Sequence, residues 1–215
     1  VPDLDNINAA QFNQAPGING QGQSLPDNLQ LIIRLFEQQF FARFNTRLEA
    51  GASEPIYLPA SGDCAWHRLF FREDYIASAL HETAHWCIAG LERLKLEDFG
   101  YWYNPDGRSA EQQQLFEAAE VKPQALEWMF ANACGQPFRL SVDNLDGESA
   151  LASASFARAL PQQARDYCEP PPLPSRAPLF IHGLPPCFDG PPVLAPAAHQ
   201  TYQLNYKPAL CKPKT

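Results

Sequence analysis

The sequence lacks any hydrophobic run long enough to cross a membrane, and it lacks an excess of positive charge. A transmembrane helix needs about 20 predominantly apolar residues, and the mean hydropathy of this chain is −0.32. The formal net charge is −8 at pH 7, which argues against charge-driven binding of nucleic acid or anionic lipid. We therefore expect a soluble protein that has neither nucleic acid nor a membrane as a direct partner.

Cysteine pairs with the spacing of a zinc ribbon or a thioredoxin motif are also missing. None of the six cysteines forms a CxxC pair, and Cys87 and Cys134 lie in apolar helical patterns typical of small buried hydrophobes. Six cysteines in 215 residues are too few for a disulfide-stapled secreted scaffold, and no signal peptide is visible. These observations favour a reducing, cytoplasmic location.

Changes of composition divide the chain into three parts. Residues 1–27 are rich in Asn, Gln, Gly and Pro, and because they cannot bury enough apolar area to offset the entropy of ordering, we expect a disordered extension. Residues 28–168 carry helical and strand patterns and form the expected single domain. Residues 169–215 are dense in proline, so we expect an extended tail that is partly packed on the domain and partly disordered.

The patterns within the expected domain predict a helix-dominated α+β fold with a small sheet. Helical periodicity predicts helices at residues 28–43, 75–95 and 110–134, and a weaker one at residues 153–168. Short strands are predicted at residues 55–59 and 66–71 and at PFRLSVDN, residues 137–144. Pro123 interrupts the 110–134 helix, which predicts a kink or two abutting helices near residues 121–123.

The helix predicted at residues 75–95 is mostly apolar, yet its middle reads HETAH, with His81, Glu82 and His85. Residues four apart on a helix project from one face, so both imidazoles can reach one metal ion at bonds of about 2.1 Å. Glu82 lies beside such an ion and suits acid–base work better than ligation. The alternative is a pair of hydrogen-bonded core histidines, but polar groups among apolar flanks are costly without a partner. The pattern therefore favours metal binding.

Two histidines require a third ligand from another part of the chain. The other imidazoles belong to a predicted strand or to the proline-rich tail: His67, His182 and His199. The helix predicted at residues 110–134 offers Glu120 as first choice and Glu117 as second choice. Glu120 precedes Pro123 closely, where a side chain can be turned out of regular helix packing. For either glutamate, the ordinary alternative is a solvated surface carboxylate.

The HETAH motif alone fits more than one class of protein. A zinc metalloprotease would use Glu82 as general base for a zinc-bound water. The same ligand types also serve non-haem iron oxygenases, so the motif does not separate the two. A third interpretation is a structural metal site or a partner-binding module. Structural zinc usually takes four ligands, and because Cys87 lies on another helical face, a fourth ligand is not evident.

Several separated motifs, in order, resemble the elongation factor P hydroxylase family. They are FNTRL, EPIYLPA, residues 75–90 around HETAH, DFGYWYNPDGR, VKPQALEW and DNLDG. The resemblance covers roughly residues 28–168; the N-terminal extension and the proline-rich C-terminus depart from the family. It implies a two-histidine, one-carboxylate site for a non-haem metal, thought to be iron, with His81, His85 and Glu120 as ligands. It also implies a protein-lysine hydroxylase whose substrate is the β-lysyl-modified lysine of elongation factor P.

The implied hydroxylase would use dioxygen, because a facial triad leaves about three positions of an octahedral iron(II) open. Glu82 would then be a second-sphere group or proton carrier. Without a Gly-rich dinucleotide fingerprint, reducing equivalents would come from outside the chain. Aromatic side chains that could contact the substrate ammonium, or else pack in the core, are Tyr101, Trp102 and Tyr103. Acidic side chains that could attract it, or else serve turns, are Asp98, Asp106, Asp143 and Asp146.

Overall fold

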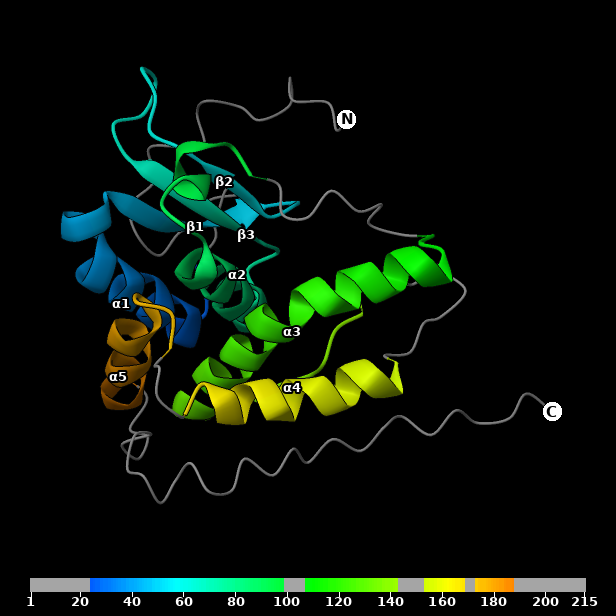
Figure 1. Cartoon of the computed structure of the whole chain (residues 1–215). Coiled ribbons are helices and arrows are strands. Elements are labelled where there is room, and N and C mark those ends of the chain that lie inside the picture. The colour runs from blue at the N-terminus through cyan, green and yellow to red at the C-terminus, as the bar shows by residue number, and fades with distance from the viewer. Residues whose placement is uncertain (1–23, 99–106, 143–152, 169–172, 188–215) are drawn as a thin grey trace.

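In the part of the chain that the structure describes, a three-stranded sheet packs with five α-helices (Figure 1). The computed structural model describes residues 24–98, 107–142, 153–168 and 173–187. In chain order the elements are α1 (Asp27–Phe44), β1 (Thr46–Ala52), β2 (Ile56–Leu58), β3 (His67–Arg72), α2 (Ile76–Ile88), η3 (Arg93–Lys95), α3 (Ala110–Ala133), α4 (Ala154–Asp166) and α5 (Ala177–Cys187). This is the helix-dominated α+β fold with a small sheet that the sequence predicts. The sequence predicts disorder for residues 1–27. Of these, residues 1–23 lie outside the described residues.

The sheet has the strand order β1–β3–β2, with β3 in the centre. Strand β3 pairs in parallel with β1, where Thr46 lies opposite His67, and antiparallel with β2, where Ile56 lies opposite Phe70. Strands β2 and β3 confirm two of the predicted strands. Strand β1 was not predicted, because only Thr46 and Leu48 among its residues are buried. So short an alternation does not distinguish a strand from a loop.

Aromatic side chains from four helices form the centre of the main core. The ring centroid of Trp86 on α2 lies 5.0 Å from that of Phe36 and 4.8 Å from that of Phe40, both on α1. Phe130 of α3 and Phe180 of α5 approach each other to 5.0 Å. Such edge-to-face and tilted pairs stabilise a core beyond the area that they bury. Because Trp86 directly follows the HETAH motif, the core fixes the position of that motif.

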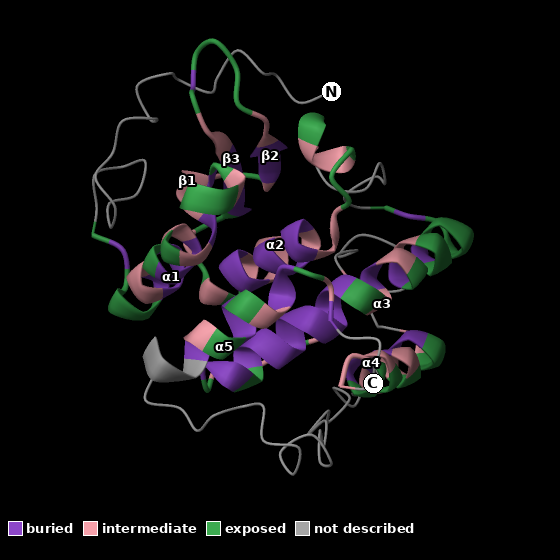
Figure 2. Ribbon diagram, turned by 60° about the vertical axis from the view of Figure 1, so that its left-hand side comes forward, coloured by how far each residue is buried: buried purple, intermediate pink, exposed green. Residues whose placement is uncertain are grey.

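Residues 177–187 form helix α5, where the sequence suggested an extended tail. Pro178 lies in the first turn, where a missing N–H costs no helical hydrogen bond. Three apolar side chains are fully buried: Phe180, Ile181 and Leu184. Gly183 permits a close approach to α1, because a Cβ there would lie 2.5 Å from Cδ1 of Leu35. Burial of this face offsets the weak helix propensity of the segment, and the core therefore includes residues beyond 168 (Figure 2).

Helix α2 is shorter than predicted, ending at Ile88 instead of residue 95. Ala89 leaves the helical region with φ −56° and ψ 131°, and the chain then makes the short η3 turn. The sequence pattern did not reveal this end because apolar residues continue past it at helical spacing. The HETAH motif therefore spans the middle of a short helix and reaches its last turn.

Helix α3 is one continuous helix that passes through Pro123, and not two abutting helices. Ser109 and Gln112 form a capping box at its start, and packing against α2, α4 and α5 supports it beyond the proline. Its N-terminal part is largely exposed, whereas the part after Glu120 is mostly buried (Figure 2). Helix α4 confirms the weaker helix predicted at residues 153–168.

The strand predicted at residues 137–144 is wrong over the part that the structure describes. Residues 136–142 have no strand partner and run irregularly beside α3. The Gln124 side chain takes the place of a neighbouring strand: its Oε1 accepts from Ser141 N at 3.0 Å, and its Nε2 donates to Ser141 O at 2.8 Å. A helix side chain thus satisfies backbone groups that a sheet would otherwise pair.

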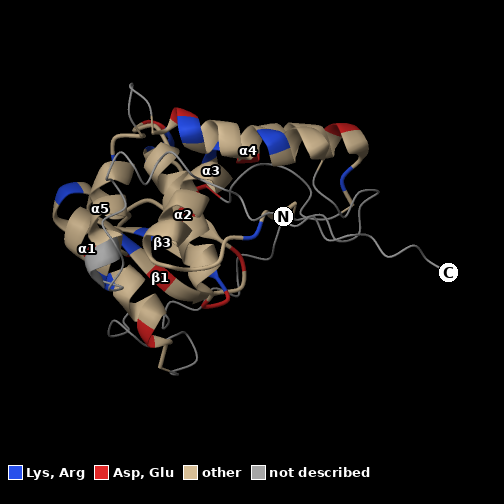
Figure 3. Ribbon diagram, turned by 90° about the horizontal axis from the view of Figure 1, so that it is seen from below, with Lys and Arg blue, Asp and Glu red and all other residues tan. Residues whose placement is uncertain are grey.

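Acidic and basic residues are interspersed along the described part of the chain (Figure 3). None of the helices in the described ranges is both long and apolar enough to cross a membrane.

Candidate metal centre

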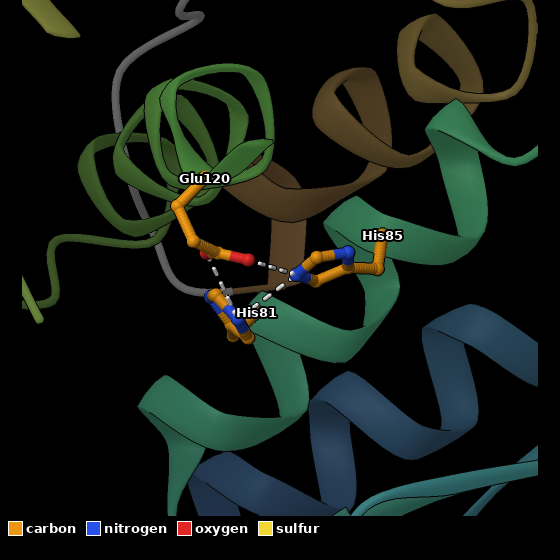
Figure 4. Close-up of side chains that lie close together, drawn as sticks. All are labelled: His81, His85 and Glu120. Atoms are coloured by element: carbon orange, nitrogen blue, oxygen red, sulfur yellow. Dashed lines mark hydrogen bonds and ion pairs between the residues drawn. The ribbon is translucent and has the colours of Figure 1, made fainter. Parts of the chain in front are cut away.

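His81 and His85 project from the face of α2 that lies against α3, as their four-residue spacing predicts (Figure 4). Their Nε2 atoms are 3.1 Å apart. The side chains are 25% and 22% exposed, so they are less buried than their apolar flanks suggest. A half-buried pair of imidazoles can be reached by a metal ion and by a substrate.

Glu120 points from α3 toward both imidazoles (Figure 4). Its Oε1 lies 3.2 Å from His85 Nε2 and its Oε2 lies 3.6 Å from His81 Nε2. One ligand atom from each of the three residues lies within 4.8 Å of the other two. Two imidazole nitrogens and a carboxylate that face one point are a donor set for zinc or non-haem iron. These three residues therefore form a possible metal site.

Glu120 is buried, with only 3% of its surface exposed, and is not the solvated carboxylate considered as its alternative. Burial raises the pKa of Glu120, but the charges of His85 and His81 and the hydrogen bonds from His85 and Gln124 outweigh burial and hold the pKa at about 2. The carboxylate is thus ionised at neutral pH. An ionised carboxylate is the form that binds a metal cation.

Glu120 belongs to a row of buried polar side chains on α3, which we call the polar stripe. Its members follow one another at alternating intervals of four and three residues: Gln113, Glu117, Glu120, Gln124 and Glu127. All five are at most 7% exposed. Intervals of three and four keep side chains on one helical face. Glu120 therefore faces α2 from a regular helix, and the expected re-aiming by Pro123 is not its cause.

Gln124 fixes the orientation of the Glu120 carboxylate. Gln124 Nε2 donates to Glu120 Oε2 at 3.2 Å, and the same amide is held by the backbone of Ser141 on both sides. A ligand whose own oxygen is hydrogen-bonded loses less conformational freedom when a metal binds.

Glu117, the second choice for the third ligand, serves another part of the structure. Its Oε1 accepts from Ser153 N at 2.9 Å, and Ser153 Oγ contacts its second oxygen. Ser153 is the N-cap of α4, where a negative charge interacts favourably with the helix dipole. Glu117 is not a member of the group formed by the two histidines and Glu120.

Glu127 is the residue of this centre that the sequence reasoning missed. Its Oε2 lies 2.8 Å from Nδ1 of His81, and it is 7% exposed. Burial alone lowers the pKa of His81, but the hydrogen bond to Glu127 and the charges of Glu120 and Glu127 raise it to about 10. The available signal was its spacing of seven residues from Glu120, two helical turns along the same face.

Glu82 lies beside the group without being part of it. The side chain is half-buried, and no hydrogen bond joins it to another residue of the described ranges. Burial raises the pKa of Glu82, although the charges of His81 and His85 act in the opposite direction. A carboxylate whose pKa is raised and which lies next to a metal site is a candidate for proton transfer.

Of the other histidines, the two that lie in the described ranges, His67 and His182, are not members of the group. His67 Nδ1 accepts a hydrogen bond from Ala60 N at 2.9 Å, and His182 is exposed on α5. His199 lies outside the described residues. Cys87 and Cys134 are 2% and 4% exposed, which confirms them as buried small residues.

The residues predicted to contact the substrate lie mostly outside the described ranges: Tyr101, Trp102, Tyr103, Asp106, Asp143 and Asp146. Their roles stay predictions. Asp98 is described, and it pairs with Arg93 at 3.0 Å while its backbone bridges to Tyr57. It therefore serves the turn after α2, which is the alternative that the sequence suggested for it.

Comparison with known proteins shows the family to which the chain belongs. The family model described as elongation factor P hydroxylase matches residues 35–198. A protein of Haemophilus influenzae named elongation factor P lysine hydroxylase is 50% identical over 149 residues, which make up 69% of this chain and 83% of that protein. A match of this extent includes both helices that carry the candidate ligands. The chain therefore belongs to the elongation factor P hydroxylase family.

Proposed function

We propose that this chain is a metal-dependent hydroxylase that adds one oxygen atom to a lysine side chain of elongation factor P. The observation that carries the proposal is the convergence of His81, His85 and Glu120 on one point, in a chain that is 50% identical to a protein named for that activity. The HETAH motif alone is equally compatible with a zinc protease. The family membership favours the hydroxylase.

The proposed metal is iron(II), held by the three converging residues. Two imidazoles and one carboxylate are the facial triad of non-haem iron oxygenases, which leaves positions open for other ligands. When bound, the iron would supply the activation of dioxygen. The proposed substrate is the lysine that already carries a β-lysyl group. Because elongation factor P acts in translation, the chain would work in the cytoplasm.

Residues of the chain itself would bind the substrate, exclude water and carry a proton. Because the two imidazoles are partly exposed, the substrate side chain is proposed to approach the centre from their exposed side, while the apolar core beneath α2 would exclude water from the other side. Glu82 would hold a proton beside the substrate. Tyr101, Trp102, Tyr103 and Asp143 are proposed to bind the cationic end of the substrate through ring faces and charge.

Anaerobic reconstitution with iron(II) tests the proposal. The loaded protein, given elongation factor P that carries the β-lysyl group, dioxygen and a reductant, should add one oxygen atom to the modified lysine, as measured by mass spectrometry of the peptide. The His81→Ala variant should produce none, because the metal then loses one of three ligands.

The protease alternative predicts a different pattern. Zinc-loaded protein would cleave peptides, and the cleavage would disappear in Glu82→Gln, because the general base would be lost. Cleavage with zinc and no added oxygen with iron would overturn the proposed function.

A further inference from the structure

Besides Glu120, the polar stripe of α3 directs one more carboxylate, that of Glu127, at the centre, where it contacts the side of His81 that faces away from the candidate metal site. Its Oε2 lies 2.8 Å from His81 Nδ1, whereas the other ring nitrogen, Nε2, lies 3.1 Å from His85 Nε2. The two nitrogens of one imidazole therefore have separate partners. One faces a buried carboxylate, and the other faces the point shared with Glu120.

We propose that Glu127 is a positioning residue that holds His81 in the tautomer and orientation needed to bind the metal. When a cation binds, Nε2 gives up its proton and coordinates through its lone pair, while a carboxylate at Nδ1 keeps the proton on that other nitrogen. The same hydrogen bond fixes the rotation of the ring and increases the basicity of Nε2. This inference rests on the metal site of the proposed function, but not on the reaction.

The structure makes Glu127 well suited to this task. It is 7% exposed and lies two turns along α3 from Glu120, so one rigid helix supplies both a ligand and the group that orients another ligand. Buried carboxylates need a hydrogen-bond donor, and the imidazole N–H of His81 is the donor in this case. The hydrogen bond to His81 therefore also satisfies the buried carboxylate of Glu127.

Two substitutions test the charge of Glu127 and its acceptor oxygen separately. Glu127→Gln keeps an acceptor oxygen but removes the charge, and we expect cobalt(II) to bind about 10-fold more weakly. Glu127→Leu keeps a similar volume but removes the acceptor, and we expect a loss of about 100-fold. Cobalt(II) affinity is measured on the metal-free protein by the visible absorption of the bound ion, whose bands also report a changed ligand geometry.

Glu117 provides a matched control on the same stripe, since it is 5% exposed and bonds to α4 instead of the centre. Glu117→Gln and Glu117→Leu should keep the wild-type cobalt(II) affinity and spectrum, even where they lower the denaturation midpoint. If Glu127→Leu does not fold, Glu127→Gln decides alone.

Wild-type cobalt(II) affinity in the folded Glu127 variants would overturn the inference, as would equal losses in the Glu117 variants, which would indicate general damage to α3. If the wild-type protein itself binds no cobalt(II), the metal site of the proposed function fails instead. The two failures are therefore distinguishable.

Discussion

Replacing Glu120 with alanine is expected to abolish stable metal binding. The substitution removes the ionised carboxylate that lies 3.2 Å from His85 Nε2 and 3.6 Å from His81 Nε2, and two imidazoles alone do not hold a divalent cation firmly. Loss of a group that only orients a ligand already costs about 10- to 100-fold in metal affinity, so loss of the ligand itself should cost at least about 100-fold. Metal content after dialysis and titration with iron(II) or cobalt(II) would measure the change.

Glu117→Ala is the matched control for this experiment, because Glu117 and Glu120 lie three residues apart on one buried face of α3. The Glu117 variant should lose stability by about 1 to 2 kcal/mol, as expected when the N-terminus of a helix loses a hydrogen-bond partner, and should still bind metal. Retained metal in Glu120→Ala together with lost metal in Glu117→Ala would assign the third ligand to the other glutamate.

Replacing Arg176 with alanine is expected to destabilise the protein by about 3 kcal/mol. Arg176 is 4% exposed, and its Nη2 donates to the carbonyl oxygens of Trp86 at 2.6 Å, of Cys87 at 3.5 Å and of Ala89. These carbonyls belong to the C-terminal end of α2, where no further turn of helix donates N–H groups to them. The guanidinium also lies 4.5 Å from the Trp86 ring centroid. Without it, buried carbonyls lose their donor, at a cost of about 1 to 3 kcal/mol each.

Chemical denaturation measures this effect, and Arg165→Ala supplies the comparison. Arg165 lies exposed near the end of α4 and donates to the neighbouring Gln162, so its loss should change the free energy of unfolding by no more than about 0.5 kcal/mol. Arg176→Lys should fall between the wild type and Arg176→Ala, because an ammonium cannot reach all three carbonyls. Equal stability of the two alanine variants would show that α2 does not depend on this arginine.

The Arg176 contacts also connect the segment that precedes α5 to the helix that carries the metal ligands. His85 lies in the last turn of α2, directly before the capped carbonyls. The segment that the sequence marks as proline-rich therefore supports the centre, although it contributes no ligand. We expect Arg176→Ala to weaken metal binding as well, by less than the loss of Glu120.

The helical part of the candidate centre could be predicted from the sequence because its geometry is local. A four-residue interval within one helix places His81 and His85 on a common face, independently of how the helix packs against the rest of the chain. Glu120 is harder to predict, since no local rule brings α3 against α2, and only the family resemblance and the nearby Pro123 point to it. The structure has Glu120 at the expected place, but a regular helical face is what puts it there.

Glu127 and α5 could not be predicted for a related reason, which is that both depend on long-range packing. A row of Gln and Glu at helical spacing has the same pattern whether it faces solvent or a second helix. Only the contact with α2 makes it a buried stripe. The proline-rich composition of the segment after residue 168 suggests an extended chain, and only burial of Phe180 and its neighbours against α1 and α3 makes a helix favourable there.

Isotope labelling of the transferred oxygen tests the central claim most directly. Iron-loaded wild-type protein, β-lysylated elongation factor P and a reductant would be supplied with dioxygen of the heavy isotope in ordinary water. The account predicts that the modified lysine gains one heavy oxygen atom, and that Glu120→Ala and His81→Ala gain none. A gain of ordinary oxygen from water, or an equal gain in the ligand variants, would contradict a dioxygen-dependent hydroxylase built on His81, His85 and Glu120.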